Sequence, residues 1–143
     1  MPSPRATGRT PPPLPPATAR TALPPFVLGQ SASLWDNLPM PVHVDLPEPM
    51  EQFGQAYGYI LYRTHLDGPH RGRLYLGDVR DYAAVYVDRR LAGTVDRRLK
   101  QVALDLDIGP GAHTLDVLVE NTGRINYGPH LADGRAGLVD PVM

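Results

Sequence analysis

The stretch from residue 102 to residue 120 alternates apolar and polar side chains with a period of two, and this pattern restricts the fold more than any other feature. VALDLDI (102–108) places aliphatic residues at every second position, and HTLDVLVE (113–120) repeats the alternation. A period of two is typical of a strand buried on one side, because successive strand side chains point to opposite faces. We therefore predict two strands joined by a turn at GPGA (109–112). The second strand should have Leu115, Val117 and Val119 on its core side, and Asp116 and Glu120 on its outer side.

Further strands are predicted between residues 57 and 95, where aromatic and β-branched residues are frequent. The expected strands are YGYILYRTHL (57–66), RLYLGDV (73–79), AAVYVD (83–88) and LAGTV (91–95). DGPHRG (67–72) has turn composition, and only Arg89 and Arg90 separate the last two strands, which predicts a hairpin. After residue 50 no stretch sustains a helical period, although MEQFGQAYG could form one helical turn. Six or seven short strands linked by Gly and Asp turns predict an all-β fold, an antiparallel β-sandwich or jelly roll.

The prolines divide the chain into unequal parts. Nine of the 17 prolines lie in residues 1–25, and four more lie in residues 26–49. Proline removes a backbone donor and fixes φ, so the first segment can neither pair in a sheet nor continue a helix. We predict a disordered, proline-rich leader (1–25), an extended strap (26–49) and a β-sandwich jelly-roll domain (50–143). The leader also contains Pro12-Pro13-Leu14-Pro15, which would suit a proline-binding adaptor, and a plain linker is the simpler interpretation.

Composition excludes several classes of function. The chain has no cysteine, so disulfides, thiolate metal sites and cysteine nucleophiles are ruled out. The formal net charge of -1 does not favour a nucleic acid or an anionic membrane as partner. The apolar runs are shorter than the roughly 18 residues that a membrane helix needs, and the opening MPSPRATGRT does not predict a signal peptide. His65 and His70 flank an expected turn but have no third ligand at useful spacing, so we predict no metal site and no cofactor.

Three motifs resemble a known family. MEQFGQAYGYILYRTHL (50–66), VRDYAAVYVDRRLAGTVDRR (79–98) and LDVLVENTGRINYGPHL (115–131) are similar to the β-sandwich region of family 35 glycoside hydrolases, the β-galactosidases. The resemblance implies a galactose-binding-like jelly roll that packs on a (β/α) barrel, and it implies that the barrel supplies the two catalytic glutamates. Arg89 departs from the family's VYVDG, where glycine suits a tight turn, so we expect a looser turn at this hairpin.

This resemblance sets the functional expectations. A (β/α) barrel needs about 250 residues, more than this chain has, so we expect no catalytic residues and no turnover by this chain alone. The first hypothesis is a non-catalytic accessory domain in carbohydrate metabolism, whose partner is the catalytic barrel of a β-galactosidase. The alternative is a free-standing module that binds galactosides weakly.

The polar segment ENTGRINYG (120–128) supplies the candidate site residues Arg124, Asn126 and Tyr127. They could hold a sugar, because jelly rolls carry such sites at loop ends. We favour a structural role, in which Tyr127 fills the end of the core and Asn126 bonds backbone groups at the corner. In that role Arg124 would bond a turn carboxylate, with Asp78, Asp81 and Asp96 as the candidates. Trp35, in the strap, is a candidate for packing against the sandwich or against a neighbouring domain.

Overall fold

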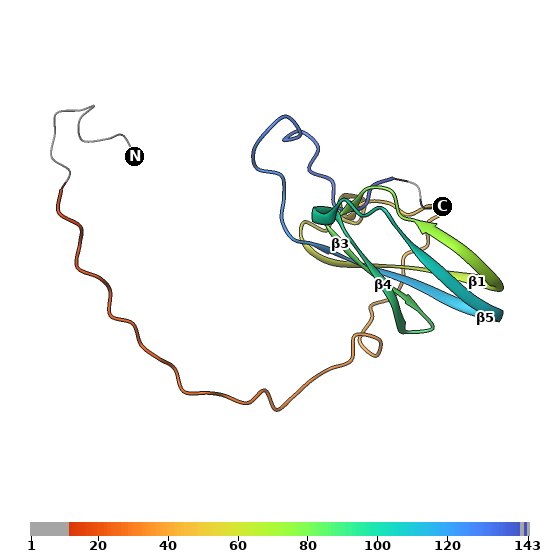
Figure 1. The fold of residues 1–143 in the computed structure, drawn as a ribbon, viewed down its shortest axis with the longest axis horizontal. Helices are drawn as coiled ribbons and strands as arrows, with labels where there is room; N and C mark the ends of the chain where they lie inside the picture. Colours follow the sequence, from red (N-terminus) through yellow and green to blue (C-terminus); the bar gives the residue numbers. More distant parts are fainter. Residues whose placement is uncertain (1–11, 141, 143) are drawn as a thin grey trace. The chain divides into compact units, whose positions relative to one another are not determined.

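The computed structural model describes residues 12–140 and residue 142, and the chain separates into two units, Met1–Asp36 and Asn37–Met143. In the first unit the described residues, 12–36, form neither helix nor strand and contain one turn at residues 34–36 (Figure 1). Part of the predicted leader, residues 1–11, lies outside the described residues. The proposed boundaries at residues 25 and 49 remain predictions.

The second unit is all-β, as the alternation predicted. Its strands are β1 (Gly58–Tyr75), β2 (Val79–Arg80), β3 (Tyr82–Val87), β4 (Arg90–Asp96), β5 (Ala103–Asn121) and β6 (Gly137–Leu138) (Figure 1). Two short 3₁₀ helices, η1 (Met50–Phe53) and η2 (Arg97–Leu99), complete the elements. The first is the helical turn predicted for this segment, and it ends at Gly54 with φ 67°. Within the described part of the chain, no helix is long and apolar enough to cross a membrane.

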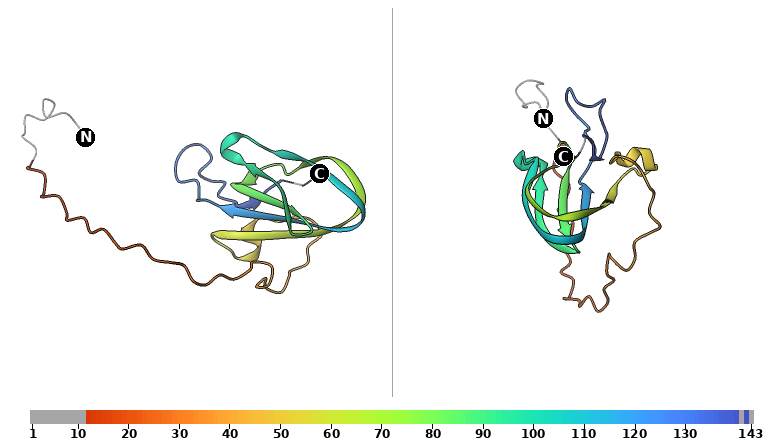
Figure 2. Two further views of the ribbon diagram at one scale, coloured as in Figure 1. Left: turned by 60° about the horizontal axis from the view of Figure 1, so that its bottom comes forward. Right: turned by 90° about the vertical axis from the view of Figure 1, so that its right-hand side faces the viewer.

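The strands form two antiparallel sheets. One has the order β1-β5-β3-β4, and the other pairs β2 with β6. Strand β1 runs beside β5 over nearly its whole length, from Gly58 opposite Asn121 to Tyr75 opposite Ala103. In Figure 2 the two strands curve round together at one end, so that their halves lie in opposite layers around the core. The prediction of an antiparallel β-sandwich is confirmed.

Two predicted turns are wrong. The segments 67–72 and 109–112 do not end strands; they lie at the bend inside β1 and β5, where the pairing register shifts between Gly68 and His70. Glycine is needed here because a Cβ on Gly68 would lie 2.0 Å from the carbonyl oxygen of Gly109. Small residues let two backbones approach and bend together, which preserves the strand pairing through a segment of turn-like composition.

The core lies between the two layers and has the side chains that the alternation assigned to it. Its fully or nearly buried members are Leu76, Val79, Ala83, Val85, Val95, Leu115, Val117, Val119 and Leu138. Asp116 is a correction: it was expected outside, yet its exposed fraction is 0%. Arg63 of β1 lies opposite Asp116 in the register and binds both carboxylate oxygens, at 2.6 and 3.2 Å. A carboxylate withdrawn from water needs such a partner, because an unpaired buried charge is strongly destabilising.

The β3–β4 hairpin has a tight turn, and the expectation of a looser one is wrong. Asp88 and Arg89 are its two central residues, with φ values of 51° and 65°. Positive φ at both positions is typical of a two-residue type I′ turn. The Asp88 carboxylate accepts a hydrogen bond from the Thr114 backbone N–H at 2.9 Å and lies 2.7 Å from Nδ1 of His113. These contacts with β5 offset the strain that a non-glycine residue meets in this conformation.

Candidate functional site: an arginine-linked corner

The polar segment after β5 begins as the turn that its sequence predicted. The side-chain oxygen of Asn121 accepts a hydrogen bond from the Gly123 backbone N–H at 3.0 Å, which closes an Asx turn. Thr122 donates from its backbone N–H and its hydroxyl to one carboxylate oxygen of Asp81, at 3.2 and 2.9 Å. The start of the loop is therefore attached to the residue that precedes β3.

Arg124 connects the loop to the start of the domain, and the acids proposed as its partners are wrong. Its Nη1 binds the Glu51 carboxylate of η1 and the carbonyl oxygen of Gly134. Its Nε donates to the carbonyl oxygen of Ala56 at 3.1 Å. Arg124 thus joins three segments: η1, the residues just before β1, and the far end of its own loop. These partners are more distant along the chain than the acids proposed from the sequence, and the structural role favoured there remains a prediction.

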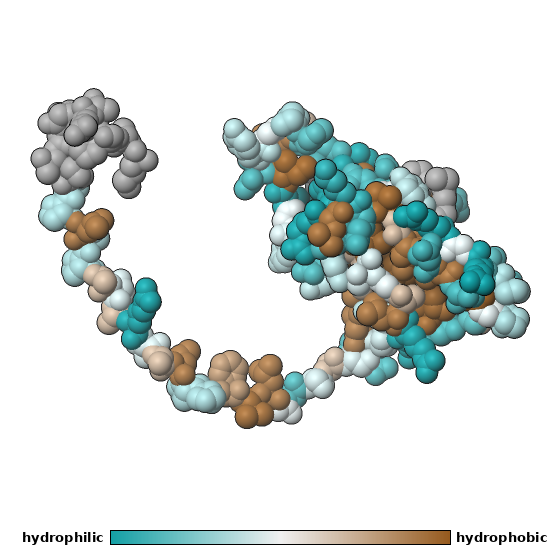
Figure 3. Space-filling view, in the orientation of Figure 1, coloured by the Kyte–Doolittle hydropathy of each residue, from teal (hydrophilic) through white to brown (hydrophobic). Residues whose placement is uncertain are grey.

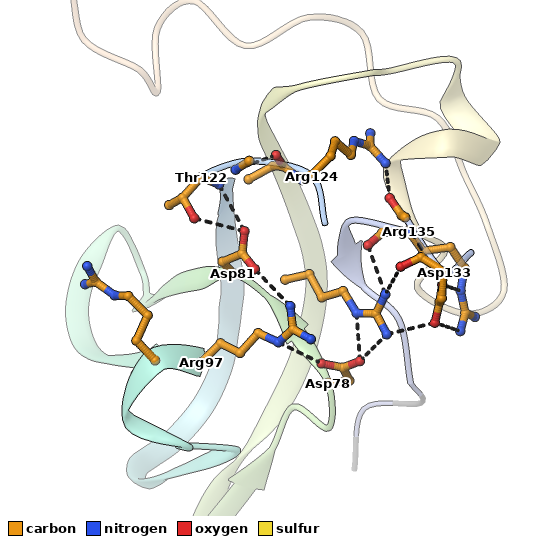
Figure 4. Close-up of polar contacts among 12 residues, drawn as sticks. Asp78, Asp81, Arg97, Thr122, Arg124, Asp133 and Arg135 are labelled. Carbon is orange, nitrogen blue, oxygen red and sulfur yellow. Dashed lines mark hydrogen bonds and ion pairs between the residues drawn. The ribbon is translucent and has the colours of Figure 1, made fainter. Parts of the chain in front are cut away.

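The three proposed aspartates are occupied by other arginines. Asp78 pairs with Arg80. Asp81 pairs with Arg97 at 3.2 Å (Figure 4). Asp96 accepts from its near neighbour Arg98 at 2.6 Å. Arg80 and Arg98 are each two positions from their acids along the chain. Arg97 is bonded to Asp81 through the backbone as well. Arg124 lies in the loop after β5, away from these three acids in the sequence.

The arginine-linked corner is the network of ion pairs and hydrogen bonds formed by Glu51, Asp78, Arg80, Asp81, Arg97, Thr122, Arg124, Asp133 and Arg135. Arg80 is its centre, and the sequence analysis did not predict it. Its side chain is only 10% exposed. Nε donates to Asp78 at 2.8 Å, Nη2 donates to Asp133 at 2.9 Å, and Nη1 donates to the carbonyl oxygens of Asp133 and Arg135. Burial alone would lower the pKa of Arg80, but the bonds with Asp78 and Asp133 raise it above the ordinary value. The signal was an arginine beside Val79 with an aspartate on each side, at positions 78 and 81.

The carboxylates of this corner are held in their charged form. Hydrogen bonds from Arg135 and then Arg80 hold the pKa of Asp133 far below its usual range. Burial would raise the pKa of Glu51, but bonds from Arg124 and from the Ala136 backbone N–H lower it overall. A general acid in glycoside hydrolysis needs a raised pKa. Because the pKa values of Asp133 and Glu51 are lowered, these acids anchor arginines and are unsuited to act as general acids.

Tyr127 does not fill the end of the core, which corrects the prediction. It is 91% exposed, on the loop that projects from the sandwich in Figure 1, and Asn126 is exposed beside it. Met50, in contrast, is fully buried, and its backbone N–H donates to the Ala136 carbonyl oxygen at 2.9 Å. The Tyr62 hydroxyl also links strands here, because it accepts from the Leu138 backbone N–H at 3.0 Å. Burial raises the pKa of Tyr62 to about 12.

The remaining candidate residues are spread over the chain. Trp35 is half-buried in the turn at residues 34–36 of the first unit, and its proposed packing role remains a prediction. His65 and His70 are both exposed on β1, on either side of the bend. Among residues 12–140 and 142, no group of three or more His, Asp or Glu side chains is arranged to hold a metal ion.

Comparison with known proteins identifies the domain. Residues 47–143 match the family described as "Beta-galactosidase, first all-beta domain". The chain belongs to this family. Two curated relatives are the β-galactosidase of Xanthomonas manihotis, 66% identical over 139 residues (97% of this chain, 23% of that protein), and the human β-galactosidase, 35% identical over 136 residues (89% and 20%). The chain therefore spans about a fifth of the length of these relatives.

A solved structure of a β-galacturonidase from Eisenbergiella tayi is similar over 64% of this chain and 17% of its own, with 22% identity and a TM-score of 0.47. Family membership confirms the prediction of an accessory β-sandwich domain of the β-galactosidase type. All side chains of the arginine-linked corner belong to residues 51–135. These residues lie within the matched range, so the corner is part of the family's domain.

Proposed function

We propose that the chain is a non-catalytic accessory domain of a family 35 β-galactosidase and that it packs on a catalytic (β/α) barrel. The observation that carries this proposal is the family match over residues 47–143, in a chain about a fifth as long as its relatives. The three motifs that resemble family 35 cover η1 and the start of β1, the segment from β2 to η2, and the end of β5 with part of the loop that follows it.

The use of the glutamates supports a non-catalytic role. A retaining glycosidase needs two carboxyl groups about 5 Å apart, one of which stays protonated near neutral pH. The chain has three glutamates, Glu48, Glu51 and Glu120. Glu51 is bound by Arg124 with a lowered pKa, and Glu120 lies on β5 between Tyr59 and Tyr82 of the neighbouring strands. Glu51 thus has the wrong protonation state for a general acid.

The corner supports a role in packing on another domain. Arg80 and Arg124 bind carbonyl oxygens at the far end of the loop between β5 and β6, and Thr122 bonds its near end to Asp81. The middle of the loop presents Tyr127, 91% exposed, and Leu131, 57% exposed. Figure 3 shows apolar surface on this projecting loop. A loop with a fixed base and an apolar tip loses little entropy on docking, and buried aromatic anchors contribute strongly to interfaces.

A domain exchange tests the proposal. In the Xanthomonas manihotis β-galactosidase, the segment that matches this chain is replaced by the chain itself, and hydrolysis of nitrophenyl β-galactoside is measured. We expect the chimera to keep most of that enzyme's activity and the isolated chain to show none. In the chimera, Tyr127→Asp should lower the melting temperature by weakening the contact, whereas the same change in the isolated chain should leave its melting temperature unaltered.

Two results would contradict this function. Turnover by the pure isolated chain would show that its own carboxylates catalyse the reaction. A chimera that folds but melts as two independent parts, with Tyr127→Asp silent in both contexts, would show that the domain does not pack on the barrel.

A further inference from the structure

We propose that a recess beside η2, distinct from the arginine-linked corner, binds a single hexose. The recess has a volume of ≈ 370 Å³ and opens between the end of β1, η2 and the residues that follow β6. Side chains of Tyr75, Lys100, Gln101 and Asp140 line it. Small-molecule sites usually have volumes of about 300–1,000 Å³, so this recess can accept one sugar ring but not an extended chain.

Backbone hydrogen bonds hold the walls of the recess in place before any ligand binds. The Leu76 N–H donates to the Val102 carbonyl oxygen at 2.8 Å, and the Val139 N–H donates to the Asp78 carbonyl oxygen at 3.2 Å. Gly77, with φ 63°, allows the Asp140 segment to approach, because a Cβ there would lie 2.7 Å from the Asp140 Cβ. A preformed site avoids the cost of ordering its loops on binding.

One polar side chain of the recess, Gln101, is already oriented, and the backbone that carries a second, Lys100, is fixed. The Gln101 side-chain oxygen accepts a hydrogen bond from the Asp96 backbone N–H at 2.9 Å, which fixes the amide and leaves its NH₂ group to donate. Lys100 ends η2 in the left-handed conformation, with φ 56° and its backbone N–H bonded to the Arg97 carbonyl oxygen. This bond fixes the backbone of Lys100, while its side chain is exposed to solvent.

The charges around the recess favour a neutral ligand with many hydroxyl groups. Arg97 and Asp78, at its base, form ion pairs with the corner network. Lys100 and Asp140 carry opposite charges, and within the described residues neither side chain has a hydrogen bond or ion pair. The Lys100 ammonium and the Gln101 NH₂ group donate hydrogen bonds, and the Asp140 carboxylate accepts them. A hydroxyl can do both, so hydroxyls on adjacent carbons of a sugar can pair with all three groups.

Tyr75 supplies the apolar wall. It is 39% exposed at the end of β1, so its ring can take the C–H face of a pyranose while the ring hydroxyls meet Lys100 and Asp140. The recess is open to water, so the expected affinity is on the order of millimolar. The choice of a hexose rests on the proposed function, whereas the position and polarity of the recess do not.

Titration of the isotopically labelled chain with galactose, followed by ¹⁵N–¹H correlation spectra, tests the proposal. We expect saturable shifts centred on the amides of Gly77, Lys100 and Gln101 below about 100 mM galactose. Lys100→Met and Tyr75→Ala should each weaken binding about fivefold, the ratio that corresponds to one ordinary hydrogen bond or comparable contact. Tyr127→Ala, on the exposed loop, is the matched control and should leave the affinity unchanged.

Several outcomes would overturn this site. They are the absence of saturable shifts, shifts confined to the loop after β5, and equal affinity in the Lys100 and Tyr75 variants when their spectra remain folded. Equal shifts with glycine would replace the hexose by a zwitterion as the ligand class. None of these results would affect activity of the domain-exchange chimera, so failure of the site and failure of the proposed function can be told apart.

Discussion

Removal of Arg80 gives the most direct test of how the corner stabilises the domain. Arg80→Met keeps a long apolar side chain and removes the guanidinium that joins Asp78, Asp133 and two backbone carbonyl groups. The arginine is 10% exposed, whereas the two acids are 30% and 37% exposed. The stranded carboxylates can therefore recover some hydration.

The expected magnitude follows from this difference in exposure. Breaking a fully buried ion pair costs about 3–5 kcal/mol, and partial hydration of the two acids reduces this to roughly 2–4 kcal/mol. A domain of this size is stable by only about 5–15 kcal/mol. Each kcal/mol lowers the melting temperature by about 4–8 °C in a small domain, so we expect a decrease of roughly 8–32 °C.

Calorimetry of the isolated chain, with urea unfolding followed by circular dichroism, measures this effect. Arg71→Met is the matched control, because the Arg71 side chain is 87% exposed. Its Nε lies 3.7 Å from Oδ2 of Asp107, which is also exposed, so this ion pair is weak. Such surface pairs contribute about 0–1 kcal/mol. Equal melting temperatures for the two variants would refute the assignment of Arg80 as the centre of the corner.

Three other changes have defined outcomes. Gly68→Ala should strongly destabilise the chain by driving a Cβ into the facing carbonyl group, whereas Gly72→Ala, with nothing within 4 Å, should be nearly neutral in the same thermal melts. Asp116→Asn should cost about 1–3 kcal/mol in urea unfolding, because the buried bidentate pair loses its charge; an unchanged midpoint would count against a paired Asp116. The hydrogen bond with Asp88 raises the pKa of His113 above 6.5, so its stabilisation should be complete below that pH and should fade as the pH rises through the raised pKa. Unfolding free energies measured from pH 5 to 9 should lose this slope in His113→Gln, and an identical slope in both proteins would contradict the contact.

Local sequence patterns were sufficient for the fold class and for much of the core. The side chains of Val117 and Val119 could be assigned to the interior because strand geometry alone places alternate residues on one face. The hairpin of β3 and β4 and the helical turn at Met50 also follow from residues close together in the chain. The same is true of the Asx turn at Asn121, whose two partners are two positions apart.

Contacts between distant segments were decided only by the tertiary structure. Arg124 had three plausible acids by sequence, but it binds Glu51, which is 73 positions away, because the fold brings η1 beside the loop. Asp116 resembles a solvated strand residue until Arg63 is placed opposite it, and the turn-like glycines become a bend once β1 and β5 pair. Alternation indicates which face of a strand a side chain lies on, and this is a property of one strand alone. Charge pairing and strand bending depend instead on which strands the fold places next to each other.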